Sequence, residues 1–313
     1  MNIVFFGTPQ IAAQLAQSLT PDINIQACVT GAPKPQGRKQ ILTPSPVHTW
    51  ATSQNIPVLY PSSLKNQNFL DQLTSISCEA WLVFAYGKIM PEWFLDLFSK
   101  KVINIHPSLL PLYRGPSPLQ APLLNGDTYT GVSLMLMDKY MDHGHLLAQE
   151  EIPLNQQTTL PQLEHQVLAI SQTLTKKTLP LYLEGKITPI PQKDDQATYT
   201  SLITKQDGEI NWLHSAYDIW NQYRAYCQWP EIYTWHKNTK ITLELTAYHT
   251  ESLLSPGEWS QLSQTLLVGT SYGEVEVSHI KPSGKPWLTP HQFAQIFDSK
   301  GRFNIAQFKK NMT

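Results

Sequence analysis

The first half of the chain alternates short apolar runs with stretches of helical periodicity. Buried strands are predicted at residues 3–6, 23–29, 80–84 and 102–105. Between them, helical spacing of apolar residues is found at 11–19, 46–53 and 69–73. This alternation is typical of βαβ units built around a parallel sheet. We therefore expect a Rossmann-like α/β domain, in which ligands bind beyond the carboxyl ends of the strands.

The second half begins with a longer amphipathic stretch. Residues 159–183 have apolar positions three and four apart, as in Leu160, Leu163 and Val167, which predicts a helix. Prolines and charges then mark residues 186–204 as a linker. After it we expect one helix and a small β domain, from apolar runs at 210–225, 239–248, 265–268 and 274–280. The expected domains are 1–185 and 205–313.

Composition limits the number of domains and the kinds of partner that this chain can have. A length of 313 residues with 41% hydrophobic content fits two domains, each with its own core. A formal net charge of −1 provides no global basic field, so any contact with nucleic acid must use local patches. Cys28, Cys78 and Cys227 are isolated and odd in number, which argues against a disulfide framework. No apolar run reaches the ~18 residues of a membrane span. We expect a cytoplasmic monomer that does not bind membranes.

Candidate chemistry lies at the end of the fourth predicted strand. Asn104 and His106 are two residues apart, and such positions of a strand point to the same face. An amide donor and an imidazole on one face suit acyl transfer, which needs a donor for a developing oxyanion and a group that handles the amine proton. Asp142, on a glycine-containing turn, is able to orient the histidine. The alternative for a lone histidine is a hydrogen bond to a neighbouring loop.

Three motifs together resemble the core of the folate-dependent formyltransferase family. They are NIHPSLLPLYRG at 104–115, TGVSLMLMD at 130–138 and MDHG at 141–144. Further matches favour the methionyl-tRNA formyltransferases within that family: FGTP at 6–9, TPSPV at 43–47, AYG at 85–87, QATY at 196–199 and INW at 210–212. The resemblance runs from the first residues to about Lys285, and its specificity lies in the order and spacing of the pieces.

The resemblance implies an enzyme that uses 10-formyltetrahydrofolate as donor. The acceptor would be the α-amine of methionyl initiator tRNA, for translation initiation, and the catalytic residues would be Asn104, His106 and Asp142. Asn104 and His106 would stabilise the oxyanion, and Asp142 would orient His106. Either His106 or a water molecule would remove the amine proton.

The resemblance also implies two binding regions. Cofactor-binding residues would be Gly87, Lys88, Ile89, Met90, Ser108, Leu109, Leu110 and Pro111, although the last four could equally form a merely rigid loop. Loop 31–42 would hold tRNA through Lys34, Arg38 and Lys39. Family members usually have a glycine and two lysines where Lys39, Gln40 and Ile41 stand here. The C-terminal domain would be an oligonucleotide-binding (OB-like) barrel that binds tRNA.

Several alternatives stay open on the sequence alone. His143 and His145 suggest a metal cluster, but a metal needs three or four converging ligands, so we expect no metal. Arg114 either shapes the acceptor loop or forms a surface salt bridge. An amino-sugar nucleotide or another small amine could replace tRNA as acceptor. A hydrolase that releases formate, or an RNA-binding protein with a retired active site, would share much of the pattern.

Overall fold

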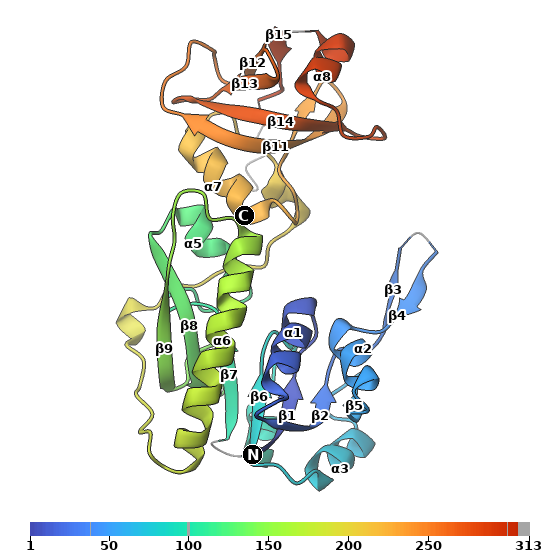
Figure 1. Ribbon diagram of the computed structural model, residues 1–313, viewed down its shortest axis with the longest axis vertical. Coiled ribbons are helices and arrows are strands. Elements are labelled where there is room, and N and C mark those ends of the chain that lie inside the picture. The colour runs from blue at the N-terminus through green and yellow to red at the C-terminus, as the bar shows by residue number, and fades with distance from the viewer. Residues whose placement is uncertain (38, 99–100, 299, 306–313) are drawn as a thin grey trace, which may run out of the picture. The chain divides into compact units, whose positions relative to one another are not determined.

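A computed structural model describes residues 1–37, 39–98, 101–298 and 300–305 (Figure 1). The chain forms two compact units. The first comprises Met1–Pro118, Tyr129–Pro153 and Glu164–Thr200, and the second comprises Leu119–Thr128, Leu154–Leu163 and the chain from Ser201 onward. The domain limits 1–185 and 205–313 concern independent folding and stay a prediction. No helix among the described residues is long and apolar enough to cross a membrane.

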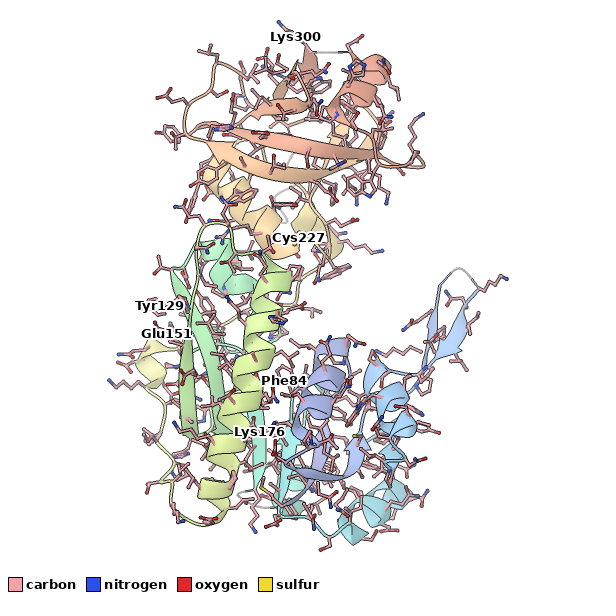
Figure 2. The ribbon with its side chains drawn as sticks, viewed as in Figure 1. Phe84, Tyr129, Glu151, Lys176, Cys227 and Lys300 are labelled. Atoms are coloured by element: carbon pink, nitrogen blue, oxygen red, sulfur yellow. The ribbon has the colours of Figure 1, made fainter. Side chains whose placement is uncertain are left out.

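A seven-stranded sheet forms the centre of the first unit, in the order β5-β2-β1-β6-β7-β8-β9 (Figure 1). Its strands are β1 (Asn2–Phe6), β2 (Asn24–Val29), β5 (Val58–Leu59), β6 (Ala80–Val83), β7 (Val102–His106), β8 (Tyr129–Leu136) and β9 (Leu146–Pro153). The pairings from β5 to β7 are parallel, and those of β7 with β8 and of β8 with β9 are antiparallel. In Figure 2, Tyr129 and Glu151 mark the two neighbouring antiparallel strands. The expected Rossmann-like α/β class is confirmed.

Side chains along the central strands point alternately to the two faces of the sheet, so the core of the first unit has two layers. Its helices are α1 (Gln10–Leu19), α2 (Pro46–Ser53), α3 (Gln67–Ser75), α4 (Glu92–Leu95), the 3-10 helices Asp96–Phe98 and Asp194–Gln196, and α6 (Leu160–Leu183), whose first residues belong to the second unit. Phe6, Phe69 and Phe94 meet in one buried cluster, so α3 and α4 cover that face of the sheet. Ile3 and Phe5, one position out of step, are buried on the other face.

The second unit contains a curled antiparallel sheet of six strands, in the order β10-β11-β14-β13-β12-β15. Its strands are β10 (Tyr233–His236), β11 (Thr239–His249), β12 (Glu258–Leu262), β13 (Thr265–Gly269), β14 (Glu274–Pro282) and β15 (Lys300–Arg302). Its helices are α5 (Gln120–Asn125), α7 (Ala216–Tyr226), α8 (Pro290–Phe297) and the 3-10 helix Lys205–Gly208. The register shifts at Leu245 between β11 and β14, as at a β-bulge, and bulges increase strand bending. The half-barrel agrees with the OB-like expectation.

One helix begins later than the sequence pattern predicted. The expected helix 210–225 is α7, which begins at Ala216. Ser215 accepts a hydrogen bond from the Asp218 N–H and the Asp218 carboxylate accepts one from the Ser215 N–H, so a capping box fixes the start. The apolar residues before it serve other contacts, because the Ile210 N–H donates to the Tyr233 carbonyl. Apolar spacing alone did not separate these two roles.

Arg224 on α7 is buried and joins three segments of the second unit. Its guanidinium donates to the carbonyl oxygens of Leu123, Asn155 and Thr158 and to the side chain of Asn221. Buried carbonyls without a donor are costly, so this one side chain stabilises the packing of 119–128 and 154–163 on α7.

Replacement of Arg224 tests this stabilising role. Arg224→Met keeps much of the side-chain volume but removes every donor, and we expect a loss of at least about 3 kcal/mol, because three carbonyls and the Asn221 side chain lose their partner. Urea unfolding followed by tryptophan fluorescence measures it, because Trp212, Trp220 and Trp259 are buried in this unit. The exposed residue Arg302 provides the control Arg302→Met, with an expected change within about 0.5 kcal/mol. Equal midpoints for the two variants would contradict the assignment.

Candidate active site

Strand β7 carries the first two site residues to the carboxyl end of the parallel strands. Asn104 is paired with Val83 on one side and Met135 on the other, and His106 is paired with Ser133. Val102 points into the buried cluster, and Asn104 and His106 follow it at two-residue steps on the same face. Their polar groups therefore lie together at the carboxyl end of β7, next to the buried cluster.

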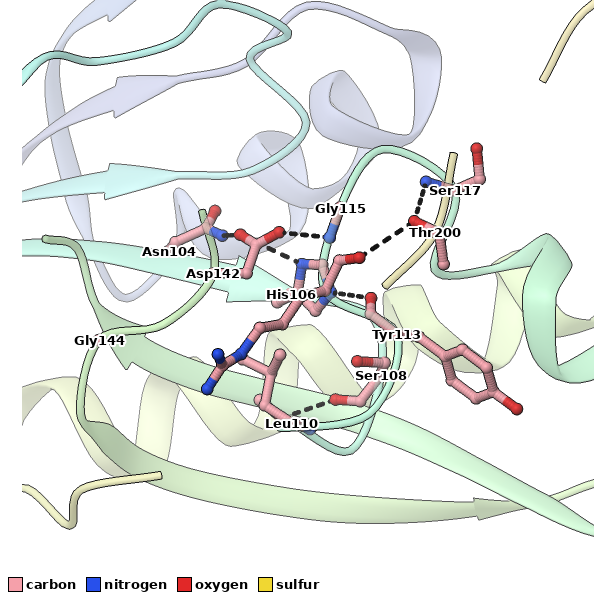
Figure 3. Close-up of polar contacts among 12 residues, drawn as sticks. Asn104, His106, Ser108, Leu110, Tyr113, Gly115, Ser117, Asp142, Gly144 and Thr200 are labelled. Atoms are coloured by element: carbon pink, nitrogen blue, oxygen red, sulfur yellow. Dashed lines mark hydrogen bonds and ion pairs between the residues drawn. The ribbon is translucent and has the colours of Figure 1, made fainter. Parts of the chain in front are cut away.

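The ring of His106 is held in one orientation (Figure 3). It is only 4% exposed, and Nε2 lies 2.9 Å from the carbonyl oxygen of Tyr113. Because a carbonyl only accepts, Nε2 carries a hydrogen and Nδ1 is the nitrogen whose protonation can change. Nδ1 lies 3.6 Å from Oδ1 of Asp142. The Asp142 carboxylate therefore lies beside the ring nitrogen that the Tyr113 carbonyl leaves free.

Asp142 meets both strand residues from a neighbouring turn (Figure 3). Its Oδ1 accepts from the Asn104 amide at 3.5 Å, and its Oδ2 accepts from the Gly115 N–H at 2.8 Å. Its backbone has φ of +50°, a conformation that non-glycine residues rarely adopt. At Gly144 a side chain is excluded, since a Cβ would lie 1.8 Å from the Leu136 carbonyl oxygen. The turn is therefore shaped for one placement of the carboxylate.

The loop that follows His106 is rigidly bonded. The buried Ser108 hydroxyl donates to the Leu112 carbonyl at 2.6 Å, and Ser133 donates to the Ser108 carbonyl at 2.6 Å. Gln149 donates to the Leu110 carbonyl at 2.9 Å. The Ser108 hydroxyl and the buried Leu110 side chain serve the shape of the loop, whereas Leu109 and Pro111 are partly exposed. The loop thus has the rigidity that the sequence left as one alternative.

The other residues that the sequence predicts to bind the cofactor form a partly exposed bend after β6. Ile89 is 91% exposed, Gly87 has open space around it at φ of +79°, and Met90 is buried. Lys88 donates to the Pro61 carbonyl at 2.5 Å. Burial lowers the pKa of Lys88, and the positive charge of Lys34 lowers it further. One expected tRNA-binding residue therefore lies near the expected donor-binding segment.

The 31–42 loop is a two-stranded hairpin, formed by β3 (Lys34–Gln36) and β4 (Ile41–Thr43) (Figure 1). Lys34 and Lys39 are exposed, and Arg38 lies outside the described residues. Ile41 and Leu42 are also exposed, although both are apolar. The surface of the hairpin is thus mixed, with cations and apolar side chains together.

His143 and His145 differ in their surroundings. His143 Nδ1 lies 2.6 Å from Asp138 Oδ2 and its Nε2 lies 3.2 Å from Asp194 Oδ2, whereas His145 is exposed. The hydrogen bond to Asp138 raises the pKa of His143, burial opposes this increase, and Asp194 adds to it. Where the structure describes the chain, no three His, Cys, Asp or Glu residues are grouped to hold a metal.

Two further residues support the site: the sequence left the role of Arg114 open, and it did not indicate Gln192. Arg114 is 1% exposed and donates to Asp194 at 2.7 Å and to Gln192 at 2.8 Å, so its ion pair with Asp194 is made by a buried guanidinium. Gln192 in turn donates to the turn of Asp142. It lies in the proline-rich stretch expected as a linker, where no periodicity marks it, and the one sequence signal is its closeness to the QATY motif.

Comparison with known proteins identifies the family. Residues 1–179 match the formyl transferase family model, and residues 202–298 match that of the formyl transferase C-terminal domain. The methionyl-tRNA formyltransferase of Caldicellulosiruptor saccharolyticus is 36% identical over 307 residues, covering 96% of this chain and 98% of that protein. That of Geobacillus thermodenitrificans is 33% identical, covering 93% of each chain. This chain belongs to the methionyl-tRNA formyltransferase family. It is a formyl-transferring enzyme.

Solved structures of more distant proteins share the fold of this family member. A sugar 3N-formyl transferase, WlaRD, crystallised with dTDP and 5-N-formyl-THF, has a TM-score of 0.66 at 19% identity, covering 91% of this chain and 99% of its own. An N-formyltransferase from Helicobacter canadensis, in complex with folinic acid and dTDP-3-aminofucose, has a TM-score of 0.64 at 19% identity, covering 88% and 97%. At this identity the likeness extends to the fold alone.

The position of His143 between two carboxylates predicts a pH-dependent contribution to stability. Because its pKa is raised in the folded chain, the contribution is fully present below the unfolded value of about 6.5 and is lost as pH rises through the folded value. The melting temperature of His143→Asn should therefore fall furthest below that of the wild type near pH 6. The difference should shrink toward pH 8. His145→Asn is the control, and a pH-independent difference for His143→Asn would contradict the ion pairs.

Proposed function

We propose that this enzyme transfers the formyl group of 10-formyltetrahydrofolate to the α-amine of methionyl initiator tRNA. The observation that carries the proposal is the convergence of the Asn104 amide, the His106 imidazole and the Asp142 carboxylate at one strand end, with contacts of 3.5 and 3.6 Å. The names of the close relatives support the acceptor. The same relatives are named for a reaction on tRNA, which supports action in the cytoplasm, and we propose that the enzyme acts as a monomer.

The donor supplies an activated formyl group, whose bond to a folate nitrogen breaks as the bond to the acceptor amine forms. The Asn104 amide donates to the formyl oxygen as negative charge develops there. His106 Nδ1 takes the proton that leaves the amine and can return it to the departing nitrogen. Asp142 holds the ring and stabilises its protonated form, since its Oδ1 is the nearest carboxylate oxygen to Nδ1.

Exposed apolar groups near the site suit a flat donor ring. Ile89 and Met141 are both exposed and lie on two segments joined by the Lys139–Glu92 ion pair, with 3.6 Å between its charged atoms. A ring that covers Ile89 removes apolar surface from water, and the space beside the Cα of Gly87 is open. Gly87, Lys88, Ile89 and Met90 are therefore proposed to bind the donor, together with Ser108, Leu109, Leu110 and Pro111.

Local cations, and not the net charge, would bind tRNA. Lys34 and Lys39 are exposed on the hairpin, and Arg38 is assigned with them from the sequence. In the second unit Lys281 lies over the half-buried Trp287 ring, with Nζ 5.3 Å from the ring centroid. Cations beside aromatic rings suit phosphate and base contacts together. The OB-like unit is thus proposed as a second tRNA-binding surface.

Removal of the strand-end groups tests the proposed chemistry. Asn104→Ala and His106→Ala should each lower kcat for formylation of methionyl-tRNA by about 10²–10³-fold, because the first removes an oxyanion donor and the second removes the group that takes the amine proton. Both variants should stay folded with tRNA binding near wild type, although His106→Ala should lower the melting temperature because it removes a buried ring and its hydrogen bond to the Tyr113 carbonyl. His145→Ala, on the exposed side of the turn, should keep full activity. Retention of more than about a tenth of the activity by either strand-end variant refutes its assignment.

The hairpin assignment predicts a salt effect. A Lys34→Ala, Lys39→Ala double variant should raise the apparent KM for methionyl-tRNA and leave that for the donor unchanged. The slope of log(kcat/KM) against log salt should become shallower by about one unit for each phosphate that the variant no longer binds. Lys177→Ala, on an exposed position of α6, is the matched control. A double variant with the wild-type slope at every salt concentration would show that these lysines do not bind tRNA.

A further inference from the structure

The side chain of Gln192 contacts both sides of the active-site turn. Its Nε2 donates to the backbone carbonyl of Asp142 at 2.9 Å and to that of Gly144 at 2.8 Å. Its Oε1 accepts from Nε and Nη2 of Arg114 at 3.1 and 2.8 Å. Both hydrogens and both lone pairs of the amide are therefore used, and only one orientation of the amide satisfies all four partners.

Arg114 gives this amide a fixed support. The guanidinium is almost fully buried and also donates to Asp194 at 2.7 Å and to the Tyr199 hydroxyl at 3.2 Å. Ile190 is bonded through its backbone to Leu146, just beyond the turn. Asp194 extends to His143 with its second oxygen. The 190–200 segment therefore meets the turn through backbone, amide and ion-pair contacts.

The turn requires an external partner because its conformation is unfavourable by itself. Asp142 has a positive φ, which costs a non-glycine residue about 1–3 kcal/mol. In this conformation the carboxylate faces His106 and Asn104. The two carbonyls that Gln192 holds belong to the 142–143 and 144–145 peptide units, so together they fix the backbone immediately after Asp142. Without both donors, the turn is free to relax and to carry the carboxylate away from His106.

We infer that Gln192 is a positioning residue for catalysis, which acts through Asp142 by holding the carbonyls of Asp142 and Gly144. The inference rests on the proposed function of Asp142 in formyl transfer. Gln192 itself does not contact the reacting groups. Its contribution should therefore appear in turnover and in the pH dependence of turnover, and not in substrate binding.

Two substitutions separate the contacts of Gln192. Gln192→Leu removes every hydrogen bond and keeps a similar size. Gln192→Glu keeps the length and the acceptor for Arg114, but its carboxylate cannot donate to the two turn carbonyls. Both variants should lower kcat for methionyl-tRNA formylation by about 10–100-fold, as a small misplacement of a catalytic group does. KM for donor and acceptor should change by less than about threefold. Gln172→Leu, which removes another amide that donates to a backbone carbonyl, should keep wild-type kcat.

A double-mutant cycle tests whether Gln192 acts through Asp142. Asp142→Asn should lower kcat and shift its pH profile, and Gln192→Leu should shift the profile in the same direction. Addition of Gln192→Leu to Asp142→Asn should then cost less than about threefold, whereas independent effects would multiply. Wild-type turnover in Gln192→Glu, or multiplied losses in the double variant, would overturn the inference. If the wild-type enzyme fails to formylate methionyl-tRNA, the proposed function fails instead, so the two failures are distinguishable.

Discussion

The interaction on which the site depends is the contact of the Asp142 carboxylate with three residues from two separate segments. It accepts from Gly115 N–H and from the Asn104 amide, and it faces Nδ1 of His106. Asn104 and His106 have fixed positions because β7 is paired on both sides. The carboxylate has no such scaffold, since it stands on a turn at a positive φ. The groups that hold the turn therefore decide whether the Asp142 carboxylate meets the two residues that the sheet has fixed.

Much of the fold was predictable because strands of a parallel sheet are buried on both faces, and such strands consist of continuous apolar runs. Runs at 3–6, 80–84 and 102–105 match β1, β6 and β7 to within a residue or two. The spacing of Asn104 and His106 on one of these strands predicted their common face, because strand geometry is local. Strand β9 was missed, since Gln149, Glu150 and Glu151 make it polar and it follows the turn at the sheet's edge.

The support of the site was not predictable from local pattern. Arg114, Asp142 and Gln192 are 28 to 78 positions apart along the chain and meet only in the folded unit. Stretch 186–204 has the prolines and charges of a linker, yet its residues Gln192 and Asp194 bond the turn and the buried guanidinium. Polar residues with long-range partners carry no periodicity. The partners of His143 were also not predictable, because one, Asp138, precedes it by five residues and the other, Asp194, lies far beyond it in the sequence.

The central claim is that the acceptor is methionyl-tRNA, and it needs a direct test because sugar formyltransferases share the fold. The direct measurement is competition between methionyl initiator tRNA and a dTDP-amino sugar for one radiolabelled 10-formyltetrahydrofolate pool, with kcat/KM obtained for each acceptor. The account predicts that label enters methionyl-tRNA with kcat/KM at least about 10³-fold higher, the scale available to a site that binds the acceptor through specific contacts. Equal or faster labelling of the amino sugar would contradict it.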